Sequence, residues 1–176
     1  MLNVADFDNL SIEGEFAVRL VDDVPSAAWL KQNIDVLGTA FIVIELHNNV
    51  FHSSSQKRAV ELIANNAIHA GVVLPIEETS LQCIDFIPDA TLRVLRNDNL
   101  LGEGAWNSLK EGPLGGLIHL VEHLEKYGRQ LLRGQIVLTG SPLPLWPISA
   151  GDKIEVQCDL LGKLATVSVE DLRTKS

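Results

Sequence analysis

Three glutamates in the first third of this 176-residue chain have a spacing that suits a cation site. Glu13 and Glu15 lie in a stretch where apolar and polar side chains alternate, which predicts a strand from Ile12 to Leu20. Side chains at i and i+2 of a strand project from one face, so these two carboxylates would stand roughly 7 Å apart at the backbone. They repel one another unless something positive lies between them. The alternative is the solvated face of an ordinary amphipathic strand.

Glu45 is the third member of this set. It interrupts the apolar segment FIVIEL, and an ionised carboxylate is expensive to bury there without a partner. Three carboxylates on two strands would suit a hard divalent cation such as Mg²⁺ or Mn²⁺, which prefers oxygen ligands and leaves coordination sites for water or substrate. The alternatives are an ion pair between Glu45 and a lysine or arginine, or a position at a strand end in water.

Of the five histidines, His47 has a position in the sequence that bears on this site. His47 follows Glu45 by two residues, so on a strand it would share that face and could reach the cation or a bound substrate. The alternative is a hydrogen-bonded structural histidine at a strand end. His119 and His123 are spaced i, i+4 on a predicted helix but lack the glutamate of an HExxH motif, so we expect them to be surface residues.

The elements that must position these residues alternate between strands and helices. Pro113 suits the first turn of a helix and Gly128 its end. Besides the strand that carries Glu13, the pattern predicts helices over residues 25–33, 54–67 and 113–127, strands over 39–47, 71–74, 135–138, 153–160 and 165–170, and a hairpin around Asn97-Asp98-Asn99.

Composition excludes several classes of function. Hydrophobic residues make up 46% of the chain, which is typical of a globular domain with a sizeable core. The net charge is −9 and the nine aromatic residues are few, so we expect no nucleic-acid partner. The apolar runs are too short for a bilayer span, so we expect no membrane association. Cys83 and Cys158 lie outside any metal-binding spacing, which predicts reduced thiols in a cytoplasmic protein.

Six segments occur in an order that matches a known family. They are IEGEFAVRL, FIVIEL, ANNAIHAGVVLP, GEGAWNSLKEGPLGG, GQIVLTGSPLPLWPISAGD and KLATVSV. Because these segments occur in this order, the chain resembles the C-terminal part of the 2-oxopent-4-enoate hydratase and 4-oxalocrotonate decarboxylase family. That family belongs to the fumarylacetoacetate hydrolase-like superfamily. The resemblance implies an α+β fold, a mixed β-roll of the fumarylacetoacetate hydrolase C-terminal type with a few flanking helices. We expect residues 1–176 to form one such domain.

The same resemblance implies a metal-dependent reaction. It places Mg²⁺ or Mn²⁺ on Glu13, Glu15 and Glu45, where the cation would bind a small 2-oxo acid and stabilise its enolate. Hydration, decarboxylation or tautomerisation would follow from that step.

Further residues of the implied site come from later segments. Thr139 and Ser141 belong to the turn that faces substrate in the family, and Asn66 matches the asparagine of its Asp-Asn pair. His69 replaces a small polar residue near the site and could serve as a new acid or base, or be a loop histidine. Trp146 follows the turn and could border the substrate pocket, although a core or interface position is the alternative.

The chain also departs from the family pattern. The family has an N-terminal segment that carries helices, part of a lid and a proton-transfer lysine, and this lysine has no counterpart here. Two readings follow. In the first, the protein is an enzyme in which His47, His69, a metal-bound water or a residue of another subunit carries the proton. In the second, it is a non-catalytic binding subunit that associates with itself or with a full-length homologue.

Overall fold

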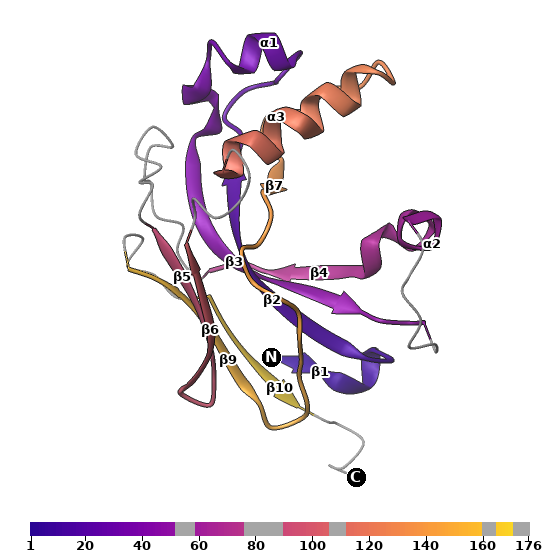
Figure 1. The fold of residues 1–176 in the computed structure, drawn as a ribbon, viewed down its shortest axis with the longest axis vertical. Helices are drawn as coiled ribbons and strands as arrows, with labels where there is room; N and C mark the ends of the chain where they lie inside the picture. Colours follow the sequence, from indigo (N-terminus) through magenta and orange to yellow (C-terminus); the bar gives the residue numbers. More distant parts are fainter. Residues whose placement is uncertain (52–58, 76–89, 106–111, 160–164, 171–176) are drawn as a thin grey trace.

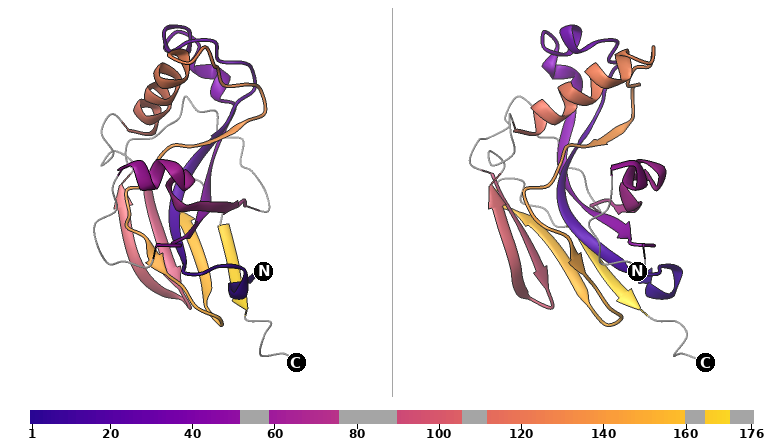
Figure 2. Two further views of the ribbon diagram at one scale, coloured as in Figure 1. Left: turned by 90° about the vertical axis from the view of Figure 1, so that its right-hand side faces the viewer. Right: turned by 45° about the vertical axis from the view of Figure 1, so that its right-hand side comes forward.

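Two five-stranded sheets form the body of the protein (Figures 1 and 2). The computed structural model describes residues 1–51, 59–75, 90–105, 112–159 and 165–170. In spatial order the first sheet contains β4 (His69–Val73), β3 (Thr39–Asn48), β2 (Leu10–Arg19) and β7 (Ile136–Leu138), with β8 (Trp146–Pro147) also paired to β2. The second contains β1 (Leu2–Asn3), β10 (Ala165–Glu170), β9 (Lys153–Cys158), β5 (Thr91–Arg96) and β6 (Asn99–Ala105).

Short helices flank the sheets. They are α1 (Ala27–Leu30), α2 (Ala59–Ala64), α3 (Gly112–Glu125) and the 3₁₀ turns η1 (Val4–Asp6), η2 (Ile34–Leu37) and η3 (Asn66–Ile68). The pair β1 and β10 is parallel, whereas the other paired strands described are antiparallel. The structure therefore confirms the expected mixed α+β class, although the sequence pattern had indicated neither β1 nor β8.

Strand β2 is central, and both of its faces are covered. It pairs with β3 on one side and with β7 and β8 on the other. Leu10, Ile12 and Phe16 pack into the core shared with the second sheet. The opposite face is not simply solvated, because Ala17 is fully buried and Glu15 is only 4% exposed. The strand is thus a buried one with acidic groups, not the amphipathic surface strand of the alternative interpretation.

The two sheets approach one another closely at Gly14. A Cβ at this position would lie 2.6 Å from Cγ2 of Val94 and 3.3 Å from Cγ1 of Val156. A real Cβ does not come that near another carbon, so glycine is required for the sheets to pack at this distance. The packing holds β2 rigidly along the stretch that carries Glu13 and Glu15.

Helices α1 and α3 cover the far half of β2, at the top of Figure 1. Leu117 and Val121 of α3 are fully buried there, as the helical spacing predicts. Past the end of α3, Gly128 adopts a φ of +63°, and the Arg129 N–H donates to the Leu124 carbonyl. The expected glycine stop is confirmed. His119 and His123 are exposed, also as expected.

Two predicted helices are shorter than expected. Helix α1 ends at Leu30 instead of continuing to residue 33, because the following N–H groups bond to carbonyls three residues back, Gln32 to Trp29 and Asn33 to Leu30. The Asn33 side-chain amide also donates to the Trp29 carbonyl (2.8 Å). The second helix, α2, ends at Ala64, and the predicted residues 54–58 lie outside the described ones.

The hairpin forms where the sequence predicts it, with Asn97 and Asp98 at positive φ between β5 and β6. Cys158 is a buried free thiol, whereas Cys83 lies outside the described residues. Among the helices that the structure describes, none is long and apolar enough to cross a membrane.

Candidate metal centre

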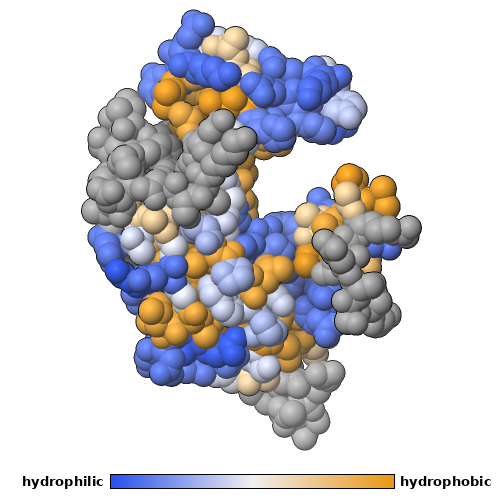
Figure 3. Space-filling model, viewed as in Figure 1, coloured by the Kyte–Doolittle hydropathy of each residue, from blue (hydrophilic) through white to orange (hydrophobic). Residues whose placement is uncertain are grey.

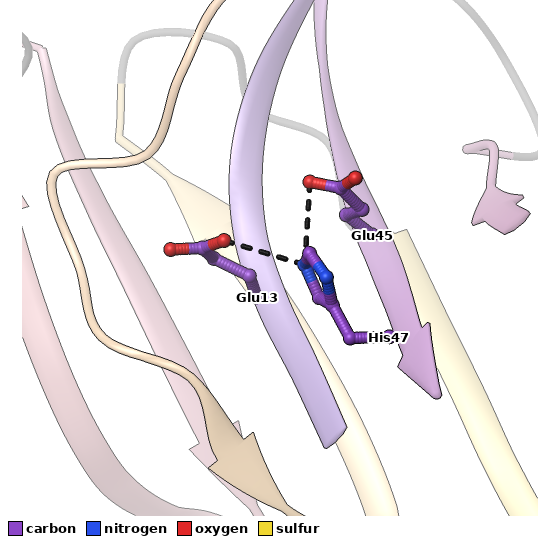
Figure 4. A group of neighbouring side chains, drawn as sticks. All are labelled: Glu13, Glu45 and His47. Atoms are coloured by element: carbon purple, nitrogen blue, oxygen red, sulfur yellow. Dashed lines mark ion pairs between the residues drawn. The ribbon is translucent and has the colours of Figure 1, made fainter. Parts of the chain in front are cut away.

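Antiparallel pairing brings two of the predicted glutamates directly opposite one another. Glu13 of β2 is the register partner of Glu45 of β3, so both side chains project from the same face of the sheet. His47 lies two residues further along β3 and shares this face (Figure 4). Its Nε2 is 3.4 Å from an oxygen of Glu13 and 3.4 Å from an oxygen of Glu45. The imidazole therefore stands between the two carboxylates.

Glu15 occupies the next position on this face, and a backbone N–H group holds its carboxylate. One of its oxygens accepts the N–H of Gly140, which follows β7, while Oε2 is buried without a hydrogen-bond partner. Its carboxyl group also interacts with that of Glu45. Gly140 lies inside the Thr139-Gly140-Ser141 turn that the sequence indicated as substrate-facing, but the contact of its N–H with Glu15 was not predicted.

His69 approaches Glu45 from the other side. Its Nδ1 lies 2.6 Å from Oε1 of Glu45. The register between β3 and β4 shifts between Leu46 and His47, so that His47 pairs with His69. Such a bulge re-aims the side chains beside it, and here it turns His69 toward Glu45. Glu45 therefore pairs with two histidines, and within the described residues no lysine or arginine takes that role.

An unusual backbone turn leads into His69. Asn66, Ala67 and Ile68 have φ values of +47°, +54° and +61°, a left-handed conformation that non-glycine residues rarely adopt. Each such residue costs about 1 to 3 kcal/mol and persists only where the surroundings enforce it. The carbonyl of Asn66 accepts the N–H of His69. The helix predicted to run to residue 67 is wrong at this point, because the chain must reverse to start β4.

Burial and mutual contact perturb the pKa values of this cluster. Desolvation raises the pKa of Glu15 to about 9, and the neighbouring Glu45 adds to the increase. Burial alone would raise the pKa of Glu45, but its contacts with His47, Glu15 and His69 outweigh this and lower it to about 2. Burial disfavours the charged form of His47, yet its contacts with Glu13 and Glu45 raise its pKa to about 9. A proton on Glu15 and one on His47 thus partly neutralise the carboxylates.

The donor set of this cluster fits a divalent cation. Glu13, Glu45 and His47 each offer a donor atom, and these atoms all lie within 4.8 Å of one another. Adjacent ligands of an octahedral ion are about 3 Å apart for metal-ligand distances near 2.1 Å. The 3.4 Å separations need little adjustment. The buried Oε2 of Glu15 and the buried Nε2 of His47 make no hydrogen bond, as expected for groups whose partner is an ion.

An apolar cluster borders the carboxylates. Ala17, Phe41 and Val43 lie on the same face of β2 and β3 and are packed against Val72 of β4 and Leu138 of β7. This packing excludes water from one side of Glu15. On the outside of the molecule, Figure 3 shows a hollow between the part formed by α1 and α3 and the part formed by α2 and β4.

The predicted substrate-facing turn is bound to β2. The Thr139 hydroxyl donates to the Phe16 carbonyl (3.1 Å), and the Ser141 hydroxyl donates to the Gly14 carbonyl (2.7 Å). These bonds hold the Gly140 N–H against Glu15. In the structure both hydroxyls serve to position the turn.

Two other predicted site residues lie elsewhere. Trp146 pairs with Ile12, so it shares the face that packs on the second sheet, where its ring would touch a Cβ at Gly102. The structure does not bring it together with the carboxylates, which project from the other face. Asn66 is exposed and contributes its backbone to the turn before His69. The remaining predicted residues, Glu13, Glu15, Glu45, His47 and His69, form one cluster.

Sequence comparison finds relatives for part of the chain. No family model matches the chain. A 108-residue stretch, 61% of the chain, is 31% identical to 2-keto-4-pentenoate hydratase 1 of Dechloromonas aromatica and covers 41% of that protein. The chain is similar to 2-keto-4-pentenoate hydratases over part of their length. The resemblance inferred from the ordered segments is thereby confirmed.

Solved structures support the fold. The 4-oxalocrotonate decarboxylase from Pseudomonas putida G7, complexed with magnesium and adipate, superposes with a TM-score of 0.83 at 17% identity, over 96% of this chain and 63% of that one. The fumarylpyruvate hydrolase from Pseudomonas aeruginosa, in complex with Mn²⁺ and pyruvate, superposes with a TM-score of 0.72 at 12% identity. The match covers 97% of this chain and 71% of that one. The chain thus has the fold expected from the resemblance and spans about two fifths of the curated hydratase that it matches.

Proposed function

We propose that this chain is the metal-binding part of a lyase or hydratase that acts on a small 2-oxo acid through enolisation. The observation that carries the proposal is the convergence of Glu13, Glu45 and His47 beside Glu15 on one face of the sheet. The relatives add support, because they are hydratases, a decarboxylase and a hydrolase, and solved examples contain magnesium or Mn²⁺. Hydration, decarboxylation and tautomerisation of 2-oxo acids all pass through an enol or enolate that such a site can stabilise.

Glu13, Glu15 and Glu45 would hold Mg²⁺ or Mn²⁺. When bound, such a cation supplies a Lewis acid that stabilises negative charge on the keto oxygen of a 2-oxo acid. The protein's own contribution is to hold the carboxylates in place. The Gly140 N–H orients Glu15, and His69 orients Glu45. The apolar cluster beside Glu15 lowers the local dielectric and strengthens these interactions.

His69 is our candidate for the proton carrier. Its side chain is 34% exposed, so its outer edge is accessible while its Nδ1 contacts Glu45. In enolisation the C3–H bond of the 2-oxo acid breaks, its electron pair forms the C2=C3 double bond, and the proton passes to the base. His69 takes that proton with Nε2. His47 is the second candidate, but it is buried among the carboxylates.

The turn of Thr139 and Ser141 would border the substrate. Its hydroxyls already bond to β2, so we assign the turn a shaping role in which its backbone faces the 2-oxo acid. Asn66 would act through its backbone, which sets the position of His69.

Exchange of substrate protons tests this proposal. Protein loaded with Mg²⁺ or Mn²⁺ is incubated with 2-oxobutanoate in D₂O, and loss of the C3 proton signal is followed by NMR. We expect exchange that EDTA abolishes and that Glu45→Gln eliminates. His119→Gln, an exposed histidine on α3, should leave the rate unchanged. Metal binding without any exchange above the metal-only background would contradict the catalytic part of the proposal.

A second function is favoured by one surface feature. Val60 and Ile63 of α2 are 65% and 79% exposed and form an apolar patch on this short helix (Figure 3). Such a patch suits a binding subunit that associates with itself or with a full-length homologue. Light scattering of the isolated protein and of its mixture with a longer hydratase tests this. Association that Ile63→Lys abolishes, together with no proton exchange, would favour the binding subunit. We expect either form to work in the cytoplasm.

A further inference from the structure

The position of His47 bears on which ion the site selects. Its ring is enclosed, with the side chain 8% exposed, and it lies between Glu13 and Glu45 at equal distances of 3.4 Å. Nδ1 has no hydrogen-bond partner, Nε2 has only these two ion-pair contacts, and both nitrogens are shielded from solvent. A buried imidazole that makes no hydrogen bond is unfavourable unless ion pairs or a further partner compensate for its lost hydration. The two carboxylates and Nε2 converge on one point, where a cation would bind all three groups.

We infer that Nε2 of His47 is a metal ligand, and that the site selects first-row transition ions over Mg²⁺. This rests on the proposed metal site and adds the identity of its ion. The three donor atoms that converge within 4.8 Å are two carboxylate oxygens and one imidazole nitrogen, not three carboxylates. Mg²⁺ takes oxygen ligands and retains water, whereas imidazole suits ions such as Zn²⁺, Fe²⁺ and Co²⁺.

The arrangement of the strands accounts for this donor set. Glu45 and His47 are two residues apart on β3, so they project from the same face, and Glu13 lies directly opposite Glu45 on β2. The pairing of β2 with β3 therefore positions all three donor atoms, and no donor comes from a loop. Glu45 is also held by His69, which occupies its other oxygen and leaves Oε2 directed at His47. A ligand held by such an outer contact is oriented before the ion arrives.

The donor set predicts an order of affinities. Affinities for first-row ions rise from Mn²⁺ to Co²⁺ and Zn²⁺ at oxygen and nitrogen sites alike, and an imidazole ligand should make this rise relative to Mg²⁺ steeper. With carboxylates alone, the rise should be shallower. His47→Leu removes the nitrogen and keeps an apolar side chain of similar size, and His47→Gln keeps a polar group if the leucine variant unfolds.

The experiment is calorimetric titration of untagged, metal-free protein with Mg²⁺, Mn²⁺, Co²⁺ and Zn²⁺, together with pulsed EPR of the Mn²⁺ form. We expect both His47 variants to weaken Co²⁺ and Zn²⁺ binding by about tenfold or more and Mg²⁺ binding by less than about threefold. We also expect ¹⁴N coupling to Mn²⁺ that disappears in both variants and persists in His119→Gln, the surface control.

The outcomes separate this inference from the proposed function. The absence of ¹⁴N coupling and unchanged Co²⁺ and Zn²⁺ binding in the His47 variants would overturn the inference and leave a carboxylate metal site standing. If no divalent ion binds the wild-type protein, the inference and the proposed function fail together. The inference is supported if the wild-type protein binds Co²⁺ and Zn²⁺ more tightly than Mg²⁺ and if both His47 variants bind them about as weakly as Mg²⁺.

Discussion

In the metal-free protein, Glu15 should make the folded state less stable as pH rises. Its pKa is about 9 in the folded state and 4.5 ordinarily, so the folded state binds this proton more tightly than the unfolded state does. A raised folded pKa gives stability that is present below pH 4.5 and lost as pH increases toward 9. Each pH unit within that window costs about 1.4 kcal/mol of unfolding free energy for one such proton.

The interval from pH 5 to 6.5 isolates Glu15. Over it the loss should be about 2 kcal/mol. His47 acts in the same direction, because its pKa rises from 6.5 to about 9, but most of its contribution is lost above pH 6.5. The low folded pKa of Glu45 adds stability that is nearly complete by about pH 5.5, one unit above its ordinary value of 4.5. The loss of stability between pH 5 and 6.5 therefore comes mainly from Glu15.

Urea unfolding in EDTA between pH 5 and 9 measures this slope. Glu15→Gln carries no titrating group, so we expect its unfolding free energy to stay level up to pH 6.5 and to fall only above it. Glu122→Gln, an exposed carboxylate on α3 that pairs with Lys31, should follow the wild-type curve. A wild-type stability that is constant or rising between pH 5 and 6.5 would refute the reasoning. So would a Glu15→Gln curve that runs parallel to it.

Four further substitutions test the site and its support. Glu45→Gln removes a charged donor and should weaken Mn²⁺ binding by about 100-fold or more in calorimetry; retention of affinity would exclude Glu45 as a ligand. Gly14→Ala places a methyl group against Val94 and should cost about 1 to 3 kcal/mol in urea unfolding, and no loss would mean that the sheets can separate there. Ser141→Ala removes the bond to the Gly14 carbonyl and should cost about 1 to 2 kcal/mol, while a neutral effect would show that the turn is held by other contacts. His69→Asn should slow proton exchange more than it weakens Mn²⁺ affinity; an unchanged exchange rate would exclude His69 as the proton carrier.

The sequence alone determined most of the strands and most of the residues of the cluster. Alternation around Glu13 and Glu15 and the apolar run around Glu45 place these carboxylates on two strands, and the i, i+2 spacing places His47 on the face of Glu45. These are local properties of a strand and need no knowledge of its neighbours. The glycine stop at Gly128, just past the end of α3, is also a local property, because it depends only on the nearby backbone.

Only the tertiary structure decided how these groups meet. The register of β2 and β3 sets Glu13 opposite Glu45, and register depends on long-range pairing that local patterns do not encode. The approach of His69 depends on a left-handed turn that overrides the helical pattern before it, and on a bulge between β3 and β4. Trp146 shows the reverse case. Its place after the turn suggested a pocket, but pairing with Ile12 put it between the sheets, because which face a strand residue takes is fixed by its partner.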